Sequence, residues 1–147
     1  MINFIAAISC LFINITSINW HYNLDEAKQL AHQEHRYILL NFSGSDWCGP
    51  CIRMHKEIFE TEVFSKMADS SLVLVNADFP RMKKNQLSAK QQDLNNAMAD
   101  KYNAKGIFPL TLLLDADGKI IRQWEGWPNM DAAAFAQQVK SILDKNQ

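Results

Sequence analysis

Two cysteines separated by two residues are the part of this sequence best suited to chemistry. Cys48 and Cys51 flank Gly49 and Pro50, and they follow shortly after a strongly apolar run. Cysteines three positions apart on a helical turn face the same side, close enough to form a disulfide. At a helix N-terminus, unpaired N–H groups and the helix dipole also stabilise a thiolate. The pattern therefore predicts a dithiol that exchanges with disulfides.

The two cysteines have different predicted roles. A thiolate is the attacking species in thiol–disulfide exchange, so Cys48, at the start of the expected helix, is the predicted nucleophile. Cys51 lies further into the helix and is expected to resolve the mixed disulfide. Pro50 suits the first helical turn, because its missing N–H would have no helical partner there.

Alternating apolar segments provide the elements that would hold this dithiol. We predict buried strands at 37–42, 72–77 and 110–114, and an antiparallel mate at 120–124 after an Asp-Gly turn. Helices are predicted at 23–35 and 49–59, and after the potential N-caps Ser88 and Asp131. This order predicts an α/β sandwich with a mixed sheet, in which parallel strands come first and an antiparallel hairpin forms one edge.

The chain resembles the thioredoxin superfamily at these residues. The string Trp47-Cys48-Gly49-Pro50-Cys51 matches the thioredoxin motif. Exported bacterial thioredoxin-like proteins, and the C-terminal domain of transmembrane thiol:disulfide interchange proteins, look similar over 41–51 and at Met54, Lys56, Glu57, Phe59, Val63 and Phe64. The resemblance implies a thioredoxin-like three-layer sandwich, with helices flanking a mixed central sheet, over residues 20–147. It also implies a thiol–disulfide oxidoreductase that needs no cofactor and no metal.

The segment from Gly106 to Thr111 occupies the place of the family's cis-proline loop. By resemblance, Pro109 is cis and lies beside the dithiol, and the backbone of Phe108 pairs with substrate. Together with Trp47, Gly49 and Pro50, these two residues form the expected substrate-binding surface. Phe108 is larger than the residues usual there, so its substrate preference is open. An ordinary trans proline before a strand is the alternative.

Asn41 stands where the resemblance places a buried aspartate, provided that one residue is inserted within 43–46. That aspartate helps to move the proton of the second cysteine, and an amide cannot take a proton. Asn41 either occupies that site or satisfies a buried backbone group. In the first case solvent, Asp46 or the departing thiolate must accept the proton. His55, four residues after Cys51, faces either Cys51 or solvent.

Residues 1–19 are predicted to be an export signal. Residues 1–20 contain no charged residue and no histidine, and most of them are apolar, whereas the chain looks soluble from His21 onward. A retained membrane anchor and a buried first element are the alternatives. Export would place the protein in the periplasm or elsewhere outside the cytoplasm, where a membrane-bound thiol donor would have to reduce its disulfide again.

Composition limits the partners of the chain. It has 147 residues, of which 48% are hydrophobic and 21% charged, as in an ordinary globular domain. A formal net charge of -1 leaves no basic excess to attract nucleic acid. Residues 79–105 are locally basic, which indicates either a solvated helix face or a docking surface for an acidic partner. We expect a monomer that acts on protein disulfides.

Other functions are also compatible with this sequence. The same dithiol could work as a disulfide oxidase or isomerase, set by its redox poise. The domain could instead be a non-catalytic binding module with a structural disulfide, for which Cys48 would be inert and buried. The two cysteines and a histidine could hold zinc, although the Gly-Pro insert before a helix favours redox chemistry.

Overall fold

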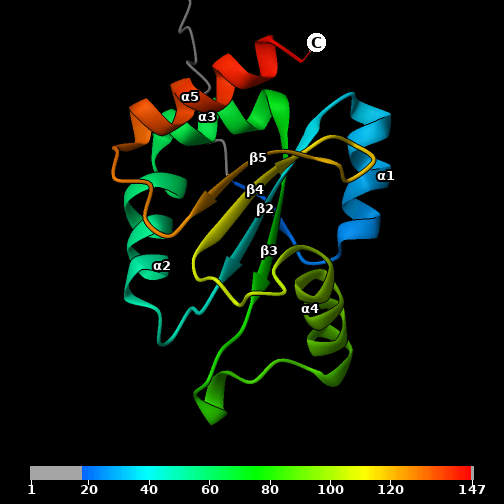
Figure 1. Cartoon of the computed structure of the whole chain (residues 1–147), viewed down its shortest axis with the longest axis vertical. Coiled ribbons are helices and arrows are strands. Elements are labelled where there is room, and N and C mark those ends of the chain that lie inside the picture. Colours follow the sequence, from blue (N-terminus) through cyan, green and yellow to red (C-terminus); the bar gives the residue numbers. More distant parts are fainter. Residues whose placement is uncertain (1–17, 147) are drawn as a thin grey trace, which may run out of the picture.

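A computed structural model describes residues 18–146, so the predicted leader at 1–19 lies almost wholly outside the described residues. Five strands form one sheet in the order β1-β3-β2-β4-β5 (Figure 1). Their bounds are Trp20–His21 for β1, Tyr37–Ser43 for β2, Leu72–Asp78 for β3, Leu110–Leu114 for β4 and Ile120–Glu125 for β5. β3 runs parallel to β1 and β2, whereas β4 is antiparallel to β2 and to β5. The predicted mixed sheet is confirmed.

Within the described residues, five α-helices accompany the sheet: α1 (Leu24–Glu34), α2 (Gly49–Met54), α3 (Glu62–Ser71), α4 (Ala89–Tyr102) and α5 (Ala132–Asp144). The side chains of Asn23, Ser88 and Asp131 accept backbone N–H bonds at the starts of α1, α4 and α5, which confirms the three predicted N-caps. A short 3₁₀ turn, η2 (Lys83–Asn85), lies between β3 and α4. No helix within residues 18–146 has both the length and the apolar character needed to span a membrane.

The structure also differs from the predicted elements. Strand β1 and helix α3 were not predicted; α3 begins at Thr61, whose hydroxyl accepts the Phe64 N–H. The helix predicted at 49–59 changes at His55 into a π-helical turn, η1 (His55–Phe59). The Glu60 N–H there donates to the His55 carbonyl five residues earlier, at 2.8 Å. Such wider turns often occur at functional sites.

Helices cover both faces of the sheet and give three layers. Helices α1 and α4 pack on one face, and α2, η1, α3 and α5 pack on the other. Figure 1 shows α3 and α5 side by side, with α1 and α4 on the opposite side of the strands. The second core is rich in aromatic rings: Phe135 is fully buried, and its ring centroid lies 5.1 Å from that of Trp124 and 6.1 Å from that of Phe64.

On the face covered by α2, the strands become polar toward their C-terminal ends. The apolar pair Leu39 and Leu74 lies in the second core, whereas the next pair on this face is Asn41 opposite Asn76. Side chains of alternate strand residues share one face, so polar groups collect at this end of the sheet. The arrows of β2 and β3 point to the end where α2 begins (Figure 1).

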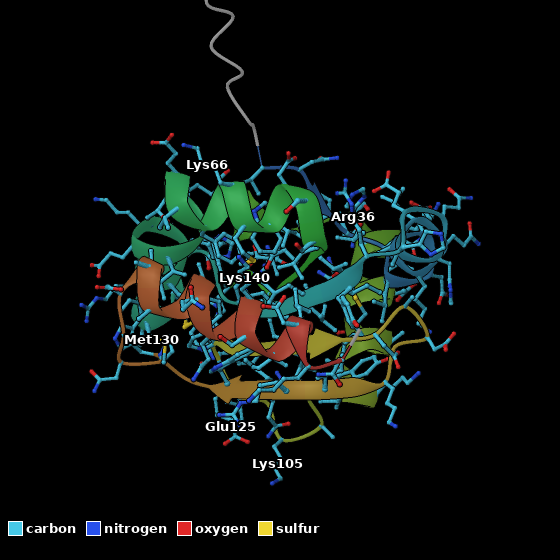
Figure 2. The ribbon with its side chains drawn as sticks, turned by 90° about the horizontal axis from the view of Figure 1, so that it is seen from above. Arg36, Lys66, Lys105, Glu125, Met130 and Lys140 are labelled. Atoms are coloured by element: carbon cyan, nitrogen blue, oxygen red, sulfur yellow. A yellow bond between two sulfur atoms is a disulfide. The ribbon has the colours of Figure 1, made fainter. Side chains whose placement is uncertain are left out.

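The aromatic core is expected to contribute strongly to stability. Replacing Phe135 with alanine would leave a cavity among packed rings, and we expect a loss of about 3–5 kcal/mol in the free energy of unfolding by urea. Lys140 of the same helix, labelled in Figure 2, is exposed, and Lys140→Ala should change the same quantity by less than about 0.5 kcal/mol. Equal losses in the two variants would contradict this description of the core.

Candidate active site

Cys48 and Cys51 form a disulfide at the start of α2, with an S–S distance of 2.08 Å and Cα atoms 5.2 Å apart. Cys48 is the N-cap residue, and its Sγ accepts the Cys51 N–H at 3.3 Å. The predicted helix N-terminal position of Cys48 is confirmed. Cys48 is 5% exposed and Cys51 is 1% exposed, while Gly49 and Pro50 between them are exposed. The arrangement gives a thiolate at Cys48 the N–H groups and dipole of a helix start.

The loop before Cys48 is shaped by Gly44. A Cβ atom at this position would lie 2.3 Å from the ring of Trp47, so any other residue would displace the tryptophan. The Gly44 carbonyl accepts the N–H groups of Trp47 and Cys48 at 3.3 and 2.9 Å. The Trp47 indole N–H in turn donates to the Phe79 carbonyl at 2.7 Å. Trp47 is thereby held in one orientation beside the disulfide.

The loop before β4 reaches the same place from far along the chain. The Phe108–Pro109 peptide bond is cis, as the resemblance implies. The ring of Phe108 packs edge-on against Trp47 at 5.4 Å and against Phe79 at 5.5 Å between centroids. The structure therefore brings the expected cis-proline loop next to the residue that precedes Cys48.

Asp46 binds the segment that follows β3. Its carboxylate accepts the backbone N–H groups of Arg81 and Met82, each at 2.9 Å, and the Asn85 side-chain amide at 3.0 Å. The pKa of Asp46 is lowered, chiefly by the Arg81 N–H bond. The guanidinium of Arg81 also lies 3.7 Å above the ring of Trp47. These contacts give no support to Asp46 as the proton acceptor considered from the sequence.

Asn41 is 1% exposed and lies in a network of side chains. Its Nδ2 donates to Asn76 Oδ1 at 3.2 Å and lies 3.3 Å from His55 Nε2. Its Oδ1 accepts the hydroxyl of Thr111 at 3.0 Å. The partners are therefore side chains of β3, β4 and η1, and the interpretation that Asn41 satisfies a backbone group is wrong.

The network continues to the loop that carries the cysteines. Ser43 Oγ lies 3.2 Å from both Asn76 Oδ1 and Asp78 Oδ1. Asp78 also accepts the backbone N–H of Ser45 at 2.8 Å and its hydroxyl at 2.5 Å. The C-terminal ends of β2 and β3 are thus tied together at the point where the chain turns toward Cys48.

His55 is half-buried, and its Nε2 lies 3.3 Å from Asn41 Nδ2. His55 and Cys51 line a cleft of about 340 Å³, to which Asn76 and Glu60 also contribute. The imidazole packs at 5.4 Å from Trp20. Burial lowers the pKa of His55, and the carboxylates of Glu60 and Asp78 oppose this shift. The imidazole is thus turned inward toward Asn41 rather than out to solvent, and it lines a cleft that Cys51 also lines.

No individual role was predicted for Gly44, Asn76, Thr111 or Asp78, although Gly44 and Thr111 lie within the segments on which the resemblance rests. The sequence signal that could have indicated Asn76 and Thr111 is a polar residue inside an otherwise apolar strand. That signal does not indicate that the two side chains share Asn41 as a hydrogen-bond partner. Residues 18–146 contain no group of three or more His, Cys, Asp or Glu side chains placed to hold a metal ion.

Comparisons with known sequences agree with this geometry. A family model described as thioredoxin-like matches residues 19–116. The chain is 34% identical over 131 residues to disulfide bond reductase DsbH of Chlamydia pneumoniae. The aligned region covers 89% of this chain and 76% of that protein. It is 31% identical over 106 residues to thioredoxin-related protein DsbJ of the same organism, covering 72% of this chain and 30% of DsbJ.

Solved structures show the same fold. A structure named DsbH oxidoreductase aligns with a TM-score of 0.77 at 34% identity, over 87% of this chain and 85% of that one. A thioredoxin from Thermus thermophilus aligns with a TM-score of 0.63 over 86% and 88% of the two chains, and its 17% identity supports the fold alone. With its bonded Cys-Gly-Pro-Cys pair, the chain belongs to the thioredoxin-like family and is a thiol–disulfide oxidoreductase.

Proposed function

We propose that this protein reduces disulfides of other proteins outside the cytoplasm. The observation that carries the proposal is the Cys48–Cys51 disulfide, whose more exposed cysteine caps α2. The chain that holds it is 34% identical to a protein named disulfide bond reductase. The oxidoreductase class follows from the family, and the reducing direction and the location are what the proposal adds.

The proposed reaction has two exchange steps. In the reduced enzyme, the Cys48 thiolate attacks one sulfur of the substrate disulfide, and the other substrate sulfur leaves as a thiol. Cys51 then attacks the sulfur of Cys48 and releases the second substrate thiol, leaving the Cys48–Cys51 disulfide. Two electrons pass from the enzyme dithiol to the substrate. A thiol donor must return two electrons before the next cycle.

The proposed substrate surface lies around Cys48, the less buried of the two cysteines. Gly49 and Pro50 are exposed there, and Trp47 and Phe108 form an apolar wall beside them. The backbone before Pro109 would pair with an extended substrate strand, as in strand addition to a sheet edge. The aromatic wall favours substrates with apolar side chains next to the reacting cysteine.

The N-terminal composition and the relatives support the proposed location and partners. An uncharged apolar stretch at residues 1–19 supports an export signal or a membrane anchor, followed by a thioredoxin-like domain at 20–147. Outside the cytoplasm, the natural electron donor for such a dithiol is a membrane-bound thiol protein. The domain would meet both the donor and its substrates as a monomer.

The Gly-Pro pair between the cysteines supports a reductant over an oxidase or isomerase. A strongly stabilised thiolate lowers the energy of the reduced form and makes the disulfide a better oxidant. Neither position 49 nor position 50 carries a histidine that could add such stabilisation. A measured reduction potential therefore distinguishes a reductase from an oxidase or an isomerase.

Equilibration with glutathione measures that potential. We expect a value close to that of thioredoxin, about -270 mV, and far from the value of about -120 mV typical of a dedicated disulfide-forming enzyme. The reduced protein should also reduce insulin, followed by the turbidity of the released chains. A potential near that of the oxidase, with no insulin reduction, would overturn the reducing direction.

Cys51→Ser should trap substrates. Without the resolving thiol, mixed disulfides through Cys48 should accumulate in the native host and disappear on treatment with a reductant. The matched control is the Cys48→Ser, Cys51→Ser double variant, which lacks the nucleophile and should trap nothing. Equal recovery of partners by both variants, or of none by either, would count against catalysis through Cys48.

A further inference from the structure

We propose that His55 takes the proton of Cys51 during resolution, and that the buried amide of Asn41 adapts its hydrogen bonding to the charge of the imidazole. The inference rests on the exchange reaction proposed above, in either direction. It supplies the proton acceptor that a chain with an amide at position 41 otherwise lacks.

Resolution requires Cys51 to lose its proton at a buried place. Burial in apolar surroundings makes a thiol harder to ionise, and Cys51 is 1% exposed. Asn41 cannot accept a proton. Asp46 is engaged by the segment after β3, and Asp78 is engaged by Ser43 at the end of β2 and by Ser45. A different base has to serve the thiol.

The imidazole of His55 lies in the right place. His55 follows Cys51 by one helical turn, and its backbone N–H donates to the Cys51 carbonyl. Both side chains line the same cleft of about 340 Å³. A water molecule occupies about 30 Å³ of liquid volume, so the cleft has room for a short water bridge between the thiol and the ring.

The surroundings keep the imidazole able to accept a proton. Its lowered pKa, caused by burial, leaves it neutral near neutral pH. The acidic groups that act on it are Glu60, beyond η1, and Asp78 at the end of β3. Lys56 lines the shared cleft, and Tyr22 lines an adjoining one next to Trp20. The two carboxylates would stabilise the imidazolium once it forms.

Asn41 can bond either form of the ring. With Nδ2 facing His55 Nε2, the amide donates to a neutral imidazole that carries its proton on Nδ1. A half-turn of the amide presents Oδ1, which accepts from a protonated Nε2. The Thr111 hydroxyl can then accept instead of donate, and the Asn76 amide can turn in the same way. Asn41, Asn76 and Thr111 can therefore stay hydrogen-bonded in both protonation states of His55.

The proton follows a closed path in this scheme. It leaves the Cys51 thiol and reaches His55 through water, and the Cys51 thiolate attacks the sulfur of Cys48. The Cys51–Cys48 bond forms as the bond between Cys48 and the substrate breaks. The departing sulfur takes the electron pair and then the proton from the imidazolium. His55 ends neutral, and no other oxidant or reductant is consumed.

Stopped-flow reaction of the reduced full-length protein with dithionitrobenzoate separates the two steps. The first released coloured thiolate reports attack by Cys48, and the second reports resolution by Cys51. His55→Gln should slow the second phase about 100-fold and leave the first phase unchanged. In the wild type, the second phase should rise with pH through the lowered pKa of His55, and this inflection should vanish in the variant. The matched control is His32→Gln, an exposed histidine of α1 paired with Asp117, which should behave as wild type.

The outcomes separate this inference from the proposed function. A wild type that resolves rapidly, with a second phase and pH profile unchanged in His55→Gln, overturns the role of His55 alone. A wild type that never releases the second thiolate overturns the exchange reaction itself. If His55→Gln does not fold, the imidazole is titrated by NMR in the oxidised and reduced wild type. A shift of the His55 titration on reduction supports the coupling to Cys51, and identical curves overturn it.

Discussion

A buried amide lowers stability unless its polar atoms are hydrogen-bonded, and Asn41 meets this condition only through residues from three other elements. Asn76 and Thr111 lie directly opposite it on β3 and β4, and His55 reaches it from η1. A slip of either strand by one residue would turn these partners to the other face. Among the described residues, no buried side-chain nitrogen or oxygen lacks a partner. The amide therefore fixes the strand register and the placement of the α2–η1 unit on the sheet.

The same polar group explains why the disulfide lies where it does. The apolar parts of β2, β3 and β4 hold the helices on both faces. Beyond Asn41, the side chains of Ser43, Asn76 and Asp78 end the apolar core and anchor the turn into α2. Cys48 at the start of that helix is 5% exposed and adjoins the exposed Gly49 and Pro50, whereas Cys51 is 1% exposed and lines a cleft with Ser43 and Asn76. The two sulfurs thus have different surroundings although they are bonded to each other.

Local patterns were enough to predict much of this arrangement. The apolar runs indicated β2, β3 and β4, the capping residues marked the starts of α1, α4 and α5, and the cysteine spacing indicated α2. The cis bond before Pro109 came from the resemblance to a family, because nothing in the local residues requires it.

The remaining features depend on contacts that no local pattern reports. β1 is two residues long, and it is held by pairing with β3 and by the packing of Trp20 against His55 and Phe59. α3 is short and polar on most of its surface, and Phe64 and Ala68 bury it against rings from distant segments. The bonds of Asn41 join residues 35 and 70 positions away in the sequence. They exist only once the sheet register and the π-helical turn bring β3, β4 and His55 together.

The contacts of Asp46 have a consequence for the surface around the disulfide. One carboxylate joins the turn before Cys48 to the segment at 81–85, and Arg81 of that segment covers Trp47. Because the pKa of Asp46 is lowered in the folded protein, its contribution to stability is present above the usual aspartate pKa and is lost only as pH falls through the lowered pKa. The link between this turn and the segment at 81–85 therefore persists under acidification that stays above the lowered pKa of Asp46, and Trp47 keeps its cover by Arg81 over that range.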